Sequence, residues 1–132
     1  MTQTPPTTPL NAYANSHANA HILTELYEVI VSRQGGNPRE SHTAKLFNKG
    51  RNKICKKFGE EAVEVVVAAL GETKQDVVSE SSDTLYHLLV LWADMGIKPQ
   101  DVWDELASRV GTSGIEEKNS RLSDEQGQTD DL

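Results

Sequence analysis

Apolar residues recur at helical spacing along the middle of the chain, and no segment shows the alternation of a half-buried strand. A first apolar stripe covers residues 22–30 and ends at the turn-rich segment "RQGGNPRES". A second helical stretch covers about residues 43–70, with Gly50 as a candidate break and Gly71 as its stop. This spacing predicts helices and no sheet.

Capping residues place two further helices. Thr73 followed by Asp76 resembles a capping box with Asp in place of Glu, and it opens a third helix that ends near Gly96. Pro99 suits the first position of a fourth helix, whose apolar stripe is Val102, Leu106 and Val110. The short connection "GET" makes the second and third helices antiparallel neighbours. The sequence predicts an all-α bundle of about four helices.

The second and third helices each carry a charged stripe. At about 100° per residue, an arc of about 80° on the second helix collects Lys53, Lys57, Glu61 and Glu64. An arc of about 60° on the third helix collects Asp76, Glu80, Asp83 and His87. We expect the opposite sides to form the core, with Ile54, Phe58, Ala62, Val65, Val66 and Ala69 on one helix and Val77, Val78, Leu85, Leu88, Leu89 and Trp92 on the other. His87 is interpreted as a packing or hydrogen-bonding histidine and a minor candidate for a site.

The acidic pairs in these stripes carry the candidate chemistry. Each pair is spaced i, i+3 with no basic residue between or directly after it, whereas solvated faces often place Lys at i+4. If the stripes converge, four carboxylates form an oxygen cage: Glu61, Glu64, Glu80 and Asp83. Such a cage suits a hard divalent cation, with Mg²⁺ as first candidate and Mn²⁺ as substitute. The alternative is a non-catalytic helical interaction module whose acidic faces are solvated.

The charged stripe of the second helix also contains lysines, which could bind phosphate. Lys53 and Lys57 lie on the same stripe as Glu61, placed to meet phosphate oxygens. A divalent cation, lysines and a water are the equipment of phosphoanhydride hydrolysis. The chain has no G-x-x-x-x-G-K-[ST] and no G-x-G-x-x-G, so metal and lysine would have to bind the phosphates.

Length and charge limit the remaining classes. The 132 residues predict one folded domain over 20–121, flanked by polar tails at 1–19 and 122–132. A net charge of −7 argues against binding to nucleic acid or to an anionic membrane. No apolar run approaches a membrane span, and the first basic residue is Arg33, so no secretory signal is expected. We expect a cytoplasmic protein with a small-molecule substrate.

Three longer motifs carry a family resemblance: "TAKLFNKGRNKICKKFGEEAVEVVVAA", "ESSDTLYHLLVLW" and "SGIEEKNSR". Over about residues 22–121 the chain resembles the phosphoribosyl-ATP pyrophosphatases of histidine biosynthesis, members of the all-α nucleoside-triphosphate pyrophosphohydrolase superfamily. The hallmark of that superfamily, E-x-x-E followed by E-x-x-D, reads here Glu61-x-x-Glu64 and Glu80-x-x-Asp83.

The resemblance implies Mg²⁺-dependent hydrolysis of phosphoribosyl-ATP to phosphoribosyl-AMP and pyrophosphate by a homodimer. The implied metal ligands are Glu61, Glu64, Glu80 and Asp83, with Glu60 as a further ligand or as a base for water. The implied substrate contacts are Lys45, Lys53, Lys57, Arg109, Lys118 and Arg121. A pyrophosphohydrolase that cleans the nucleotide pool shares the acidic hallmark and stays open, although "TAKLF", "LYHLLVL" and "SGIEEKNSR" favour the histidine enzyme.

Overall fold

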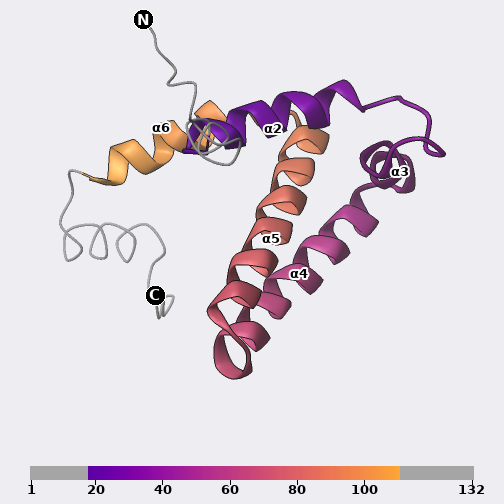
Figure 1. Cartoon of the computed structure of the whole chain (residues 1–132). Helices are drawn as coiled ribbons and strands as arrows, with labels where there is room; N and C mark the ends of the chain where they lie inside the picture. The colour runs from indigo at the N-terminus through magenta and orange to yellow at the C-terminus, as the bar shows by residue number, and fades with distance from the viewer. Residues whose placement is uncertain (1–17, 111–132) are drawn as a thin grey trace, which may run out of the picture. The chain divides into compact units, whose positions relative to one another are not determined.

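The computed structural model describes residues 18–110, which contain five helices and no strand (Figure 1). The helices are α2 His21–Ser32, α3 His42–Lys49, α4 Arg51–Gly71, α5 Lys74–Met95 and α6 Pro99–Val110. The all-α prediction is confirmed. The predicted tails fall almost wholly outside the described residues, and their boundaries stay predictions.

The chain divides into two units, Met1–Pro99 and Gln100–Leu132. Helices α2 to α5 belong to the first unit, and α6 lies almost entirely in the second. None of the helices in the described part of the chain combines the length and the apolar content needed to cross a bilayer.

The first unit is organised around an antiparallel hairpin of α4 and α5, which lie side by side over most of their length (Figure 1). The predicted capping box opens α5: the Thr73 hydroxyl accepts a hydrogen bond from the Asp76 backbone N–H at 3.1 Å, and the Thr73 backbone N–H donates to the Asp76 carboxylate at 3.1 Å. These bonds from Thr73 lower the pKa of Asp76, the backbone bond most. The predicted stop is also confirmed, since Gly96 caps α5 in the left-handed conformation.

Removing this cap gives a modest, testable loss of stability. We expect Thr73→Ala to lower the free energy of unfolding by about 1 kcal/mol, because the first turn of α5 loses the acceptor for its N–H. Urea unfolding at fixed protein concentration measures the change, and Thr73→Ser, which keeps the hydroxyl, serves as the control. Equal stability of the Ala and Ser variants would show that the cap does not contribute.

The core lies at the end of the hairpin away from the Thr73 turn, where α2 and α3 pack on it (Figure 1). Its buried members are Ile30, Leu46, Ile54, Leu89, Val90 and Ala93. Gly50 separates α3 from α4 with a φ of 96°, a value that L side chains rarely adopt, so the candidate break is confirmed. That break lets α3 turn back over the hairpin instead of continuing α4.

Part of the predicted core is wrong. Val66, Val78 and Leu85 are 56%, 55% and 43% exposed, and Ala69 is exposed as well. Helix α4 instead buries Ile54 and Ala68 and exposes one apolar stripe, here called the outer valine face: Val63, Val66, Val67 and Leu70. The second half of α4 carries apolar residues on two sides. The side with the small residue Ala68 packs inward, and the other side is exposed.

Candidate active site

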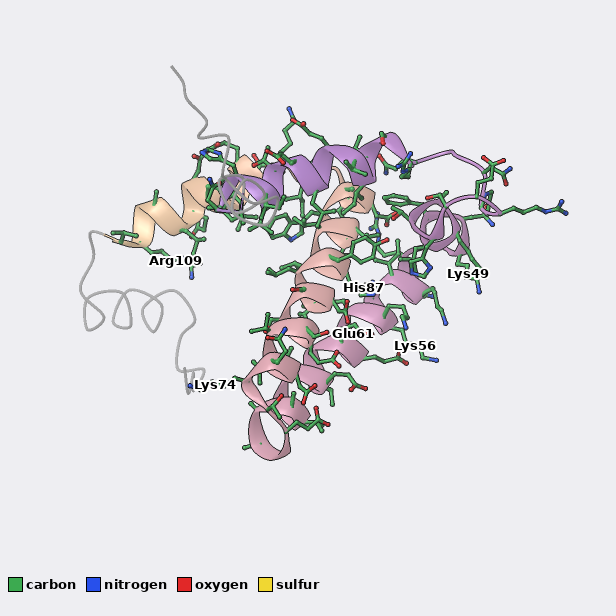
Figure 2. The ribbon with its side chains drawn as sticks, viewed as in Figure 1. Lys49, Lys56, Glu61, Lys74, His87 and Arg109 are labelled. Carbon is green, nitrogen blue, oxygen red and sulfur yellow. The ribbon has the colours of Figure 1, made fainter. Side chains whose placement is uncertain are left out.

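Three carboxylates from the two hairpin helices converge. Glu61 of α4 and Glu80 and Asp83 of α5 each offer an oxygen, and these oxygens all lie within 4.8 Å of one another. The antiparallel pairing sets Glu61 against an α5 face on which Glu80 and Asp83 stand three residues apart. Figure 2 shows Glu61 between the ribbons of α4 and α5. We call Glu61, Glu80 and Asp83 the acidic cluster.

The fourth predicted ligand, Glu64, lies at the edge of this group. Its side chain is exposed, and it is not among the carboxylates that meet within 4.8 Å. Its charge nevertheless reaches the cluster, because it contributes to the raised pKa of Glu80. The structure therefore brings three of the four predicted ligands together, and the role of Glu64 stays a prediction.

The carboxylates of the acidic cluster repel one another. The pKa of Glu80 is raised, first by partial burial, then by the charges of Glu64, Glu61 and Asp83, and by a hydrogen bond with Glu61. A carboxyl in this setting holds its proton to higher pH because burial and the three neighbouring negative charges all disfavour its ionised form. A divalent cation would relieve the same repulsion, so the donor set fits a hard cation with oxygen ligands.

This raised pKa makes stability depend on pH. In the folded state the pKa of Glu80 lies above 4.5, the ordinary pKa of a glutamate, whereas the unfolded chain releases this proton near pH 4.5. The contribution of Glu80 to stability is therefore fully present below pH 4.5 and is lost as pH rises through the folded pKa.

We expect metal-free Glu80→Gln to have a higher Tm than the parent at pH 7, with a difference that shrinks as pH falls toward 4.5. Thermal unfolding in the presence of a chelator measures both proteins. Glu25→Gln, on the exposed surface of α2, controls for the general effect of removing one negative charge. A difference that grows at low pH would contradict the assignment.

Lys57 supplies positive charge at the cluster. Its Nζ lies 3.7 Å from Glu60 Oε1 and 3.9 Å from Glu61 Oε2. The Glu60 side chain is 47% exposed, whereas that of Glu61 is 18% exposed. Glu60 thus pairs with Lys57 on the open side and does not join the cluster.

The other predicted substrate contacts are less closely placed. Lys53 is partly exposed one turn before Lys57, and Lys45 is exposed on α3. Arg109 lies on α6, where its Nε donates to Glu105 Oε2 at 3.0 Å. Lys118 and Arg121 lie outside the described residues, as does the motif "SGIEEKNSR". All these substrate roles stay predictions.

His87, interpreted from the sequence as a packing or hydrogen-bonding histidine, is buried. It is 6% exposed, and its Nδ1 is fully buried without a hydrogen-bond partner in the described part of the chain. The pKa of His87 is lowered, and burial of the ring is the main cause. The charges of Glu61 and Asp83 raise this pKa, whereas those of Lys57 and His42 lower it further. The available signal was its position on the same α5 face as Glu80 and Asp83.

Comparisons with known proteins agree with these features. The family model described as phosphoribosyl-ATP pyrophosphohydrolase matches residues 23–110. A phosphoribosyl-ATP pyrophosphatase of Paramagnetospirillum magneticum is 66% identical over 103 residues, covering 78% of this chain and 94% of the relative. Relatives of the same name from Rhodospirillum rubrum and Azospirillum brasilense are 62% and 52% identical, over 76% and 83% of this chain and 86% and 99% of their own. The chain therefore belongs to the phosphoribosyl-ATP pyrophosphohydrolase family.

Proposed function

We propose that this protein hydrolyses phosphoribosyl-ATP to phosphoribosyl-AMP and pyrophosphate, a step of histidine biosynthesis, and that it requires Mg²⁺. The observation that carries the proposal is the convergence of the Glu61, Glu80 and Asp83 carboxylates within 4.8 Å. The names of the relatives supply the substrate.

Glu61, Glu80 and Asp83 would hold the ion, with Glu64 one turn further along α4 as a fourth carboxylate. The chemistry that Mg²⁺ supplies there is neutralisation of negative charge on the phosphate oxygens. Mn²⁺, which accepts the same oxygen ligands, is the expected substitute.

The residues around the cluster would bind and orient the triphosphate. Lys57 stands beside Glu61 and Glu60, so its ammonium is placed to contact a phosphate oxygen next to the acidic cluster. Lys53 would extend this contact one turn along α4, and Lys45 from α3. Water attacks the α-phosphorus in line: its oxygen forms a new P–O bond, the bond to pyrophosphate breaks, and a proton of the water is released to solvent. No side chain serves as a covalent nucleophile.

We also propose that the protein is a homodimer. The outer valine face exposes Val63 and Leu70 by 61% and 85%, with Val66 and Val67 between them. A continuous apolar stripe of this kind is typical of a surface that binds another protein chain. Helices α2 to α5 enclose a small core of six buried residues, and a second copy packed on this face would enlarge it.

Phosphorus NMR tests the proposed activity. Full-length protein is incubated with Mg²⁺ and phosphoribosyl-ATP, and in parallel with ATP and with deoxynucleoside triphosphates. We expect pyrophosphate from phosphoribosyl-ATP alone, and none after chelation of the metal. Preference for a plain nucleotide would instead favour the pool-cleaning alternative. If no substrate yields pyrophosphate and calorimetry shows no saturable Mg²⁺ site, the result would favour the non-catalytic module.

A further inference from the structure

A buried nitrogen atom of His87, in α5, lacks a hydrogen-bond partner among the residues that the structure describes. Within residues 18–110, the Nδ1 atom of His87 is the side-chain nitrogen or oxygen that is fully buried and has no hydrogen bond. Buried polar atoms in folded proteins are almost always hydrogen-bonded, and one left unpaired costs stability. A histidine kept only for packing would be replaced at no loss by an apolar side chain, so the unpaired atom points to a partner that arrives with a ligand.

His87 lies beside the acidic cluster. It stands four residues after Asp83 and seven after Glu80 on α5, which places all three on one face of the helix. The charges of Glu61 and Lys57, from α4, also act on its ring. Figure 2 shows His87 and Glu61 between the same two helices. The ring is thus the buried continuation of the acidic face.

Contacts from α3 fix the orientation of this ring. Tyr86 packs edge-on against His87, with ring centroids 4.9 Å apart. The Tyr86 hydroxyl forms a hydrogen bond with the Thr43 hydroxyl of α3, and its ring lies parallel to that of His42 at 6.4 Å. Since α3 holds Tyr86 through two residues, the edge-on contact with Tyr86 restricts rotation of the His87 ring.

We propose that His87 is a positioning residue for the acidic cluster, whose Nδ1 gains a hydrogen bond to Glu61, directly or through one water, when the cluster binds its divalent cation. The Glu61 carboxylate shares a hydrogen bond with Glu80 and lies 3.9 Å from the Lys57 ammonium. Carboxylates that hold a metal are themselves held by hydrogen bonds from neighbouring groups, which fix their orientation. The inference rests on the proposed metal-dependent function.

Calorimetry with Mg²⁺ alone, on the full chain, tests the proposal. We expect His87→Leu to weaken Mg²⁺ binding about 10–100-fold. Its metal-free Tm should stay equal or rise, because an unpaired buried polar atom has been removed. His87→Asn, whose amide places a polar atom near the Nδ1 position, should restore most of the affinity. His87→Gln, whose amide reaches the Nε2 position, should not, and it is the matched control.

Parental affinity in His87→Leu would overturn the proposal. A weaker Mg²⁺ affinity together with a clearly lower metal-free Tm would also overturn it, because that pair of results indicates a structural role only.

A second measurement observes the His87 ring in the parent protein directly. In protein with ¹⁵N-labelled histidine, the Nδ1 signal of His87 should move on addition of Mg²⁺ toward the position of a hydrogen-bonded nitrogen. Its assignment follows from its absence in His87→Asn. A parent that binds Mg²⁺ with an unmoved His87 signal contradicts the positioning role alone. A parent that binds no Mg²⁺ contradicts the proposed function as well.

Discussion

Replacing Glu61 by Gln is expected to lower kcat/KM for phosphoribosyl-ATP by more than about 100-fold, beyond the about 10–100-fold typical of groups that only support a metal ligand. Glu61 is the one member of the acidic cluster that α4 contributes. The amide keeps the volume and removes the charge, so the acidic cluster would keep only its two α5 carboxylates, with the exposed Glu64 beside them. At 1.36 kcal/mol per factor of ten, the loss exceeds about 2.7 kcal/mol of transition-state stabilisation.

The neighbouring substitution Glu60→Gln is the matched control. Glu60 pairs with the same Lys57, at 3.7 Å, but its side chain is more exposed and it does not join the cluster. We expect its kcat/KM to stay within about tenfold of the parent, since loss of an exposed ion pair has a small effect. An equally large loss in Glu60→Gln would instead favour its role as a metal ligand or as a base for water.

Thermal unfolding of the metal-free proteins separates chemistry from folding. Glu61→Gln should not lower the Tm, because it removes one of the charges that repel Glu80. Near-parental turnover in a folded Glu61→Gln protein would contradict the assignment of Glu61 as a ligand.

The local features of this fold could be predicted from the sequence because each depends on a few adjacent residues. The Thr73 cap, the Gly96 stop and the break at Gly50 follow from hydrogen-bonding groups and backbone freedom at single positions. The meeting of Glu61 with Glu80 and Asp83 needed one further step, the short connection that makes α4 and α5 antiparallel. The three-residue spacing of Glu80 and Asp83 then placed both of them on the α5 face that meets Glu61.

The features that the sequence did not predict depend on which side of a helix meets its neighbour. Both sides of α4 are apolar enough to pack, so periodicity did not show that Ala68 faces inward and Val66 outward. The ring that packs edge-on against His87 is Tyr86, which bonds to Thr43, 43 residues earlier in the chain. Contacts of that range follow from the packing of α3 on the hairpin and leave no local pattern.

The second large effect is expected from a substitution on the exposed side of α4. We expect Val66→Asp to convert the protein from a dimer to a monomer. Val66 lies within the outer valine face, between Val63 and Leu70. A carboxylate buried there without a partner costs about 3–5 kcal/mol, which weakens association by about 10²–10⁴-fold. In an interface with two-fold symmetry each copy contributes one such charge, so the free-energy cost is doubled.

Light scattering coupled to gel filtration measures the mass, and Val29→Asp is the matched control. Val29 is 48% exposed on α2, close to the 56% of Val66, so it tests the same substitution on another helix. We expect this control to remain dimeric. A Val66→Asp protein with the parental dimer mass, or a parent that is monomeric, would show that the outer valine face does not join two copies.

Concentration dependence of the Tm gives an independent check on the same interface. A protein whose folded state is a dimer gains stability with concentration, because association draws the equilibrium toward the folded form. The parental Tm should therefore rise as the protein is concentrated, whereas that of Val66→Asp should be lower and independent of concentration. The acidic cluster is built from one chain, so residual Mg²⁺ binding in folded Val66→Asp would show that the second copy supports the hairpin without supplying the ligands.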